Sequence, residues 1–335
     1  MDFPPAIQAL LWPLSVFYGL YVRLRAWCYA RGWLKQNRLR GKVISVGNLT
    51  VGGTGKTPMV IWLAERLLAE GKRVAILSRG YRGANGTSDE IELMKQRFQE
   101  RVAFGVGKNR YLQGQRLEAQ QDIDVFLLDD GFQHLQLARD LDIVLMDASR
   151  QMAKERLLPA GQLREPLSAL GRANLLIFTR IENAPGAREA IQRLGKFPVF
   201  AAETRLRGFR LFGGDTAVFP ADSIGPGPFF AFCGIGNTDA FFRDLESWHA
   251  PVTGSRKFPD HHRYVPEDIA LLERAASRAN AKAFLTTEKD AQNLAGLALP
   301  PLPVYVAVID LEILPEAEFL AVIGRTMPER GRVTA

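Results

Sequence analysis

Cysteine and histidine are both scarce in this chain of 335 residues. Its two cysteines, Cys28 and Cys233, stand far apart, which excludes a disulfide framework and fits a reducing compartment such as the cytosol. Only four histidines are present, so any histidine in an acidic stretch is a candidate for catalysis. The chain also lacks internal repeats and low-complexity tracts. Its hydrophobic content of 47% is typical of a globular protein, and its length is sufficient for two domains.

Acidic residues are almost absent from the first forty positions, where Asp2 is the only one. Six basic residues in the same stretch give it +5 of the net charge of +7. The positive charge is therefore local, which argues against a nucleic-acid-binding surface, and we expect no nucleic-acid partner. The basic residues are Arg23, Arg25, Arg31, Lys35, Arg38 and Arg40.

The apolar run Ala6–Val22 is interrupted by Pro13. As a helix it would span roughly 25 Å, less than the roughly 30 Å of a bilayer's hydrocarbon core. A signal peptide would begin with positive charge, which this chain lacks. We therefore interpret residues 1–40 as an amphipathic, membrane-associated helix whose basic end meets anionic lipid phosphates, the alternative being a helix packed on the main domain. The aromatic residues expected at the headgroup boundary are Trp12, Phe17, Tyr18, Tyr21 and Trp27.

From residue 41 onward, short apolar runs that predict strands alternate with helical patterns, which indicates a parallel α/β sheet. A stretch rich in Gly and Pro then separates this part of the chain from a second, shorter part in which predicted strands and helices also alternate. We predict an N-terminal helix in residues 1–40, a nucleotide-binding domain in 41–205, a linker in 206–228 and a smaller α/β domain in 229–335.

A glycine-rich segment, "VGNLTVGGTGKTP", lies between a predicted strand at 42–46 and a predicted helix at 58–69. It is similar to the phosphate-binding pattern G-x-x-x-x-G-K-[ST], with Thr50 in place of the first Gly. Backbone N–H groups before a helix can hold phosphate oxygens, Lys56 would reach the β- and γ-phosphates, and Thr57 would bind Mg²⁺. The predicted nucleotide-binding residues are Thr50, Val51, Gly52, Gly53, Thr54, Gly55, Lys56 and Thr57.

Two adjacent carboxylates, Asp129 and Asp130, follow the apolar run Val125–Leu128. A phosphoryl-transfer site needs an acidic group at the end of a neighbouring strand to hold magnesium. Two carboxylates beside a buried strand are also costly without a cation. The pair is therefore predicted to bind Mg²⁺, and a turn or a helix cap is the alternative.

Two other classes of protein share single features of this chain. Thr179–Glu182 stands where a GTPase carries its guanine-reading [N/T]-K-x-D motif, but Lys is replaced by Arg180 and Asp by Glu, so adenine is favoured. His261 and His262 in "FPDHHRY" are similar to the DHH motif of metal-dependent phosphoesterases, which need further acidic motifs and have no nucleotide loop.

Seven segments follow one another along the chain: "VGNLTVGGTGKTP", "LSRGYRG", "LLDDGFQH", "LLPAGQLREP", "FCGIGNTDAFF", "FPDHHRY" and "TTEKDA". Taken together and in this order, they resemble the tetraacyldisaccharide 4'-kinase family, and the resemblance extends from about residue 5 to about residue 325. The form of the loop with Thr50 is itself a family trait. The expected fold is a P-loop NTPase-like parallel-sheet domain with a second, smaller α/β domain and an N-terminal membrane-associated helix.

The resemblance implies an ATP- and Mg²⁺-dependent lipid kinase. The family transfers the γ-phosphate of ATP to the 4'-hydroxyl of tetraacyldisaccharide 1-phosphate, giving lipid IVA in lipid A biosynthesis. The expected partners are this anionic glycolipid and the cytoplasmic face of the bacterial inner membrane, with no obligate protein partner. A membrane-recruited P-loop GTPase or ATPase, acting as a switch or a scaffold, is the alternative function.

The resemblance also implies residue roles. Lys56 is expected to act on the transferred phosphate, Asp89 to be the catalytic base, and His261 to be its partner, brought over the site by domain closure. Because "SDEI" replaces the usual "GDEP" around Asp89, Glu90 is the alternative base. The implied metal ligands are Thr57, Asp129, Asp130 and Glu165, and the implied substrate contacts are Arg79 and Arg164.

Overall fold

The computed structural model describes residues 5–80, 88–150, 155–181, 184, 198–214, 217–220, 227–298 and 301–326. The chain forms two compact units, each discontinuous in sequence. The first comprises Met1–Tyr81, Phe98–Glu203 and Leu311–Ala335, and the second Arg82–Arg97 and Thr204–Asp310. Strands β7 (Val199–Leu211) and β11 (Val304–Leu314) each begin in one unit and end in the other.

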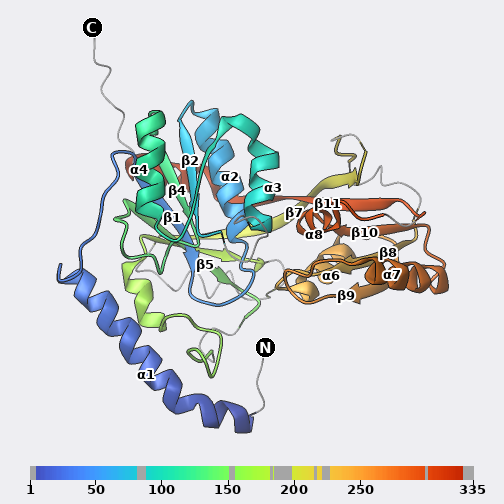
Figure 1. The fold of residues 1–335 in the computed structure, drawn as a ribbon, viewed down its shortest axis with the longest axis horizontal. Coiled ribbons are helices and arrows are strands. Elements are labelled where there is room, and N and C mark those ends of the chain that lie inside the picture. Colours follow the sequence, from blue (N-terminus) through green and yellow to red (C-terminus); the bar gives the residue numbers. More distant parts are fainter. Residues whose placement is uncertain are drawn as a thin grey trace. The chain divides into compact units, whose positions relative to one another are not determined.

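The first unit is built on a parallel sheet with the strand order β3-β2-β4-β1-β5-β6-β7 (Figure 1). Nearly every residue of β1, β4 and β5 is buried, as expected for strands covered on both faces. Because all these strands are parallel, the loops after β1, β4, β5 and β6 meet at one edge of the sheet. The strands are β1 (Lys42–Asn48), β2 (Val74–Ser78), β3 (Ala103–Val106), β4 (Val125–Asp129), β5 (Leu141–Asp147) and β6 (Leu175–Thr179).

Helices cover this sheet and close its core. α2 (Lys56–Ala69) packs on β1 and β4, and α4 (Arg110–Gln120) packs on β2 and β3. α9 (Glu316–Thr326), near the end of the chain, adds the fully buried Phe319. Two 3-10 helices, η2 (Gln99–Arg101) and η4 (Leu167–Arg172), and helix α1 complete the described part of the unit.

The second unit has its own parallel strands, in the order β11-β10-β8-β9. Aromatic rings fill one side of its core, where the ring centroid of Phe232 lies 5.5 Å from Tyr264 and 5.9 Å from Phe284. The predicted α/β class, with a parallel-sheet domain and a smaller α/β domain, is confirmed. The helices and strands of the second unit are α3 (Asp89–Phe98), β8 (Phe229–Cys233), α6 (Thr238–Ser247), β9 (Val252–Lys257), α7 (Pro266–Arg278), β10 (Ala283–Thr287) and α8 (Glu288–Leu294).

Helix α1 (Pro5–Ala30) is longer than the sequence predicted. Its 26 residues extend about 39 Å, and Pro13 lies inside it without ending it. The roughly 25 Å expected for the apolar run Ala6–Val22 is therefore too short for this helix. Pro13 does not interrupt it, because one proline removes one backbone hydrogen bond and the flanking turns continue. Among the described residues, Ile7–Ala30 is the one helix long and apolar enough, by length and composition, to cross a membrane.

Other boundaries also differ from the predicted ones. Asp89 and Glu90, for which the sequence predicted no helix, are the first residues of α3, because acidic side chains are favourable at a helix N-terminus. The range 206–228, predicted as a linker, begins inside β7. The chain beyond Asp310 belongs to the first unit, although the sequence placed it in the smaller domain.

Candidate active site

The glycine-rich segment connects β1 to α2 at the carboxyl edge of the first unit's sheet. Gly52 and Gly55 have φ angles of 112° and 84°, a region that favours glycine. No side chain of the described residues caps the start of α2, so the N–H groups of its first turn are available to an anion. The segment therefore has the local geometry of a phosphate loop.

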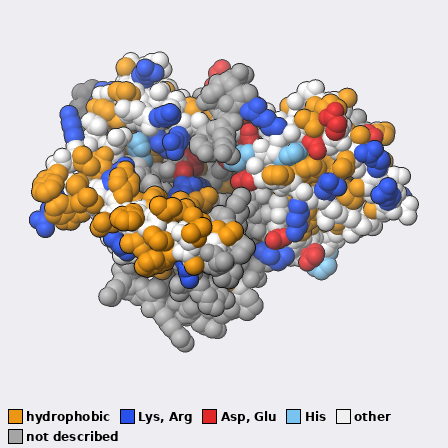
Figure 2. Space-filling view, turned by 60° about the horizontal axis from the view of Figure 1, so that its bottom comes forward, with side chains coloured by type: hydrophobic (Ala, Val, Ile, Leu, Met, Phe, Trp, Pro, Cys, Tyr) orange, Lys and Arg blue, Asp and Glu red, His pale blue; other side chains and the backbone are white. Residues whose placement is uncertain are grey.

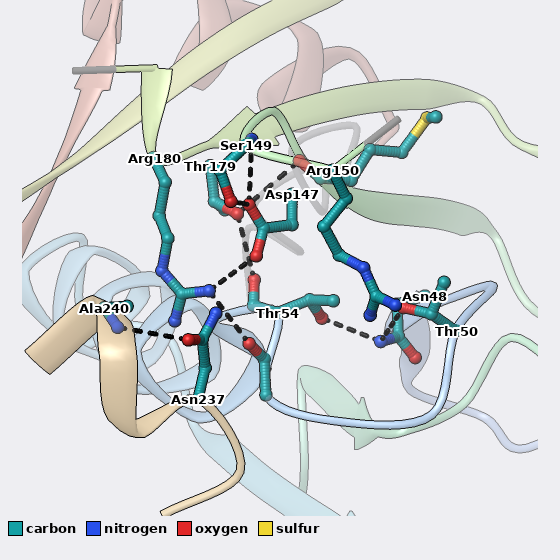
Figure 3. Close-up of polar contacts among 12 residues, drawn as sticks. Asn48, Thr50, Thr54, Asp147, Ser149, Arg150, Thr179, Arg180, Asn237 and Ala240 are labelled. Atoms are coloured by element: carbon teal, nitrogen blue, oxygen red, sulfur yellow. Dashed lines mark hydrogen bonds and ion pairs between the residues drawn. The ribbon is translucent and has the colours of Figure 1, made fainter. Parts of the chain in front are cut away.

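Lys56 is the first residue of α2, and its side chain lies at the same edge. Its Nζ donates to Oδ1 of Asn48 at 3.2 Å and lies 3.6 Å from Oδ1 of Asp130. Asn48, buried at the end of β1, also donates from Nδ2 to Oγ1 of Thr54 at 2.8 Å (Figure 3). Asn48 thus ties the strand, the loop and the lysine together, a role that sequence analysis missed because an amide has no motif of its own.

Asp129 and Asp130 lie where the sequence placed them, at the end of β4. Asp129 is buried, accepts a hydrogen bond from Oγ of Ser78 at 3.3 Å, and pairs in register with Val46 of β1. Both carboxylate oxygens of Asp130 accept from Nη1 of Arg164, at 2.8 and 2.7 Å. Burial tends to raise the pKa of Asp130, but Lys56 and Arg164 outweigh it and hold this pKa below its usual value.

The remaining predicted residues of the first unit lie near this edge. Thr57 follows Lys56 in the first turn of α2, and Arg79 follows the last residue of β2. Glu165 is buried, and its Oε2 accepts from Nη2 of Arg172 at 2.8 Å.

Side chains at the end of β6 hold the glycine-rich segment by hydrogen bonds to that segment's backbone (Figure 3). Oγ1 of Thr179 donates to the carbonyl of Thr54 at 3.2 Å, and Nη1 of Arg180 donates to the carbonyl of Gly53 at 3.2 Å. The same Nη1 lies 2.6 Å from Oδ2 of Asp147, which is buried at the end of β5. The segment compared with a guanine-reading motif therefore fixes the loop, and its Glu182 lies outside the described residues.

In the second unit, Asp89 and His261 come together although they are 172 positions apart. Nδ1 of His261 lies 3.2 Å from Oδ2 of Asp89, and both side chains are about three-quarters buried or more, with exposures of 25% and 20%. This hydrogen bond lowers the pKa of Asp89 and raises the pKa of His261. Glu90, the alternative base, lies 3.8 Å from Nε2 of the same histidine.

Asp290 stabilises the loop that carries His261 through hydrogen bonds to its neighbours. Asp290 is fully buried in α8, and its Oδ1 accepts from the backbone N–H of Gly234 and from the hydroxyl of Tyr264. The carbonyl of Gly234 in turn accepts from the N–H of His261 at 3.1 Å. The motif "TTEKDA" therefore has a structural role, because its Asp290 helps to hold the backbone that positions His261.

The other histidines of interest have different partners. His262 binds Asp268 through Nε2 at 2.8 Å, and His134 lies 3.3 Å from Nη1 of Arg110. Burial and then Arg110 lower the pKa of His134 to about 4, so this imidazole is neutral near pH 7. Neither histidine therefore shares the pairing of His261 with Asp89.

The chain matches the model of the family described as tetraacyldisaccharide-1-P 4'-kinase over residues 7–327. It belongs to this family. The tetraacyldisaccharide 4'-kinase of Geobacter metallireducens is 41% identical over 326 residues, covering 92% of this chain and 95% of the relative. That of Geobacter sulfurreducens is 39% identical over 330 residues, covering 93% and 92%. The crystal structure of "apo" form LpxK from Aquifex aeolicus in complex with ATP is 30% identical, with a TM-score of 0.77, covering 96% of this chain and 100% of the other.

Membership in the tetraacyldisaccharide 4'-kinase family makes the protein an ATP-dependent kinase of lipid A biosynthesis. Membership in this family excludes the alternative functions considered from the sequence, which were a GTPase switch, a scaffold and a DHH-type phosphoesterase. The two clusters described above are the parts of this kinase whose chemistry suits phosphoryl transfer.

Proposed function

We propose that this kinase binds ATP at residues 50–57 and uses Asp89 as base, with His261 as its partner, to phosphorylate the 4'-hydroxyl of tetraacyldisaccharide 1-phosphate at the cytoplasmic face of the inner membrane. The hydrogen bond between Asp89 and His261 carries the proposal, because it pairs a carboxylate and an imidazole from distant parts of the chain. Such a pair is suited to accept a proton in a fixed direction.

The proposed chemistry needs one proton transfer. As the sugar oxygen bonds to the γ-phosphorus, its proton passes to Asp89, and the bond from phosphorus to the leaving oxygen breaks to release ADP. The lowered pKa of Asp89 keeps it ionised at neutral pH, so it is ready to accept this proton. Protonated His261 would hold the carboxylate in orientation through Nδ1–H.

At the phosphate loop, cationic side chains and backbone N–H groups would stabilise the negative charge of the phosphoryl group during its transfer. Lys56 extends over the loop, where Asn48 and Asp130 hold its ammonium group. Arg164 donates to both oxygens of the same Asp130 carboxylate. Both cations would be positioned before the nucleotide binds, which is the arrangement that stabilises a developing phosphate charge at least cost.

Mg²⁺, when bound, would supply positive charge beside the phosphates of ATP. The donors fit this ion: Thr57 lies in the first turn of α2, and Asp129 ends the strand next to β1. Mg²⁺ keeps several waters and needs only one or two carboxylates. Among the described residues, no three His, Cys, Asp or Glu side chains are grouped so that they alone could hold a metal ion.

The two other predicted ligands are paired with arginines. Asp130 binds Arg164, and Glu165 binds Arg172. We therefore assign the direct contacts with the ion to Thr57 and Asp129. Asp130 and Glu165 would act by holding these arginines beside the phosphates.

Helix α1 supports binding to a membrane surface. A narrow strip of it faces the protein: Oγ of Ser15 donates to the carbonyl of Leu157, and the Tyr18 hydroxyl donates to the carbonyl of Arg164. Most of its other side chains are exposed and hydrophobic, including Phe17 at 71% and Leu10 at 77% (Figure 2).

This docking favours a helix that lies on the membrane over one that crosses it. Ser15 and Tyr18 stand in the middle of α1, so a crossing helix would draw the polar backbone they contact into the hydrocarbon core, at a cost of several kcal/mol per unsatisfied group. Tyr18, expected at the headgroups, therefore faces the protein, while Trp12, Phe17, Tyr21 and Trp27 remain exposed.

The test is transfer of labelled γ-phosphate from ATP to tetraacyldisaccharide 1-phosphate in detergent micelles. We expect Lys56→Ala and Asp89→Asn to lower kcat by about 10²-fold or more, and His261→Ala to lower kcat far more than ATP affinity. Asp268→Asn, which removes the carboxylate of the neighbouring His262 pair, is the matched control and should stay near wild type. Full activity of Asp89→Asn, or an equal loss of kcat and ATP affinity in His261→Ala, would overturn the assignment of the pair.

A further inference from the structure

Helix α8 brings Asn293 to the carboxylate of Asp89. Nδ2 of Asn293 donates to Oδ2 of Asp89 at 3.2 Å, the same oxygen that His261 binds at 3.2 Å. Asn293 is 204 positions from Asp89 and lies just beyond the "TTEKDA" motif, so nothing in the sequence connects it to the base.

Two donors on one oxygen leave the two oxygens of Asp89 unequal. Within the described residues, the side-chain hydrogen bonds to this carboxylate reach Oδ2 and not Oδ1. The terminal torsion of an aspartate is otherwise broad and roughly two-fold, so one donor alone allows the carboxylate to turn about the bond. A second donor on the same oxygen restricts this rotation and leaves Oδ1 without a side-chain donor among the described residues.

The helix that carries Asn293 is itself firmly held. Asp290, three residues earlier, is fully buried and accepts from Gly234 and Tyr264. Gln292 exchanges hydrogen bonds with Gln96 of α3, at 2.6 and 3.0 Å. The amide of Asn293 is therefore presented by a rigid element and not by a loop.

We propose that Asn293 is a positioning residue for the base: with His261 it binds Oδ2 of Asp89 and leaves Oδ1 to accept the proton of the sugar hydroxyl. This inference rests on the proposed role of Asp89 as base. Asn293 acts through Asp89 and needs no contact with the substrate.

Charges around the pair set the expected pH dependence. Lys289 of α8 lies 3.4 Å from Glu90 and 3.0 Å from Asp260, which itself lies 3.8 Å from Nε2 of His261. His261, then Asn293, then Lys289 lower the pKa of Asp89 against the opposing effect of burial. Loss of the Asn293 donor should therefore move the acidic limb of the activity profile to higher pH.

The test compares variants of the full-length kinase by γ-phosphate transfer to the lipid acceptor across pH. Asn293→Ala should lower kcat about tenfold, leave both KM values within about twofold, and shift the acidic limb upward. Asn293→Asp keeps the shape but sets a carboxylate against Oδ2, so it should lose more activity at neutral pH and shift the limb further. This second variant keeps the test informative if the alanine variant folds poorly.

Gln292→Ala is the matched control, because it removes the two hydrogen bonds of Gln292 with Gln96 of α3 without touching Asp89. An unshifted acidic limb in Asn293→Ala and Asn293→Asp, or an equal shift in Gln292→Ala, overturns the positioning role. The role of Asp89 as base stands in that case if Asp89→Asn still lowers kcat by about 10²-fold or more. If Asp89→Asn keeps its activity, the proposed base is wrong and the role of Asn293 is wrong with it.

Discussion

At the scale of single residues, Arg180 shows how a familiar motif can hold a different role. It stands where a GTPase would read guanine, yet its guanidinium joins the carboxylate of Asp147 to the carbonyl of Gly53. Asp147 is 2% exposed, so the pair lies in a region of low dielectric where an unpaired charge is costly. Arg180 therefore supports both the fold and the position of the phosphate loop.

Arg180→Ala should destabilise the protein and weaken nucleotide binding together. Removing one partner of a buried pair costs about 3–5 kcal/mol, so we expect a loss of about 3 kcal/mol in the free energy of unfolding and a raised KM for ATP. Urea unfolding and steady-state kinetics measure the two effects. Arg38→Ala removes an exposed ion pair with Asp140 and should cost less than about 1 kcal/mol. Similar losses in both variants would contradict the role of Arg180.

The Asp89–His261 pair should also give the free energy of unfolding a distinct pH dependence. The pKa of Asp89 is lowered, so its contribution is present above its unfolded pKa of about 3.9 and is lost as pH falls. The pKa of His261 is raised, so its contribution is present below about 6.5 and is lost as pH rises. The stability difference between wild type and His261→Gln, measured by urea unfolding, should be larger at pH 5 than at pH 8.5; the reverse order would contradict the pairing.

At the scale of elements, the sequence predicted the buried strands well and the polar elements poorly. β4 and β5 contain the short apolar runs Val125–Leu128 and Ile143–Met146, and such runs are typical of buried strands. α3 was missed because its helical residues follow a Gly- and Ser-rich stretch, and β9 because an alternation of exposed Thr, Ser and Lys carries little apolar signal. Asn48 and Asn293 were missed for a related reason: their partners are decided by tertiary packing.

Helix α1 gives a prediction at this scale. Phe17→Glu and Leu20→Glu place charge on exposed positions of its hydrophobic surface, at 71% and 62% exposure, so both should reduce binding to anionic lipid vesicles by about tenfold or more. Their circular dichroism should match wild type, because neither side chain packs on the protein. Gln121→Glu, at the exposed end of α4, adds the same charge away from α1 and should bind as wild type does. Vesicle flotation measures binding, and equal binding of all variants would exclude α1 as the membrane contact.

At the scale of the whole molecule, the chain does not divide at the composition change that suggested a linker. β7 and β11 each pass from one unit to the other, and the last described helix, α9, belongs to the first unit. Composition marks where polar residues accumulate along the chain, but it carries no information about a late segment that returns to an early core. The sequence therefore predicted two α/β units correctly without revealing that the C-terminal helix completes the N-terminal unit.

Phe319 of α9 allows this return of the chain to be tested. Its side chain is fully buried, with its ring centroid 5.6 Å from Trp62 of α2 and 5.1 Å from Phe200 of β7. Phe319→Ala should lower the free energy of unfolding by about 3–5 kcal/mol and reduce amide hydrogen-exchange protection in β1 and α2.

The matched variant is Phe284→Ala, which opens a cavity of the same kind in the core of the second unit. It should reduce protection in β8 and β10 first, because Phe284 lies on β10 and its ring packs against Phe230 and Phe232 of β8. If Phe319→Ala instead loosened β8 and β10 while β1 and α2 kept their protection, α9 would belong with the smaller domain, as the sequence alone had suggested. A loss centred on β1 and α2 would show that the phosphate loop, between these two elements, depends on a helix more than 250 residues later in the chain.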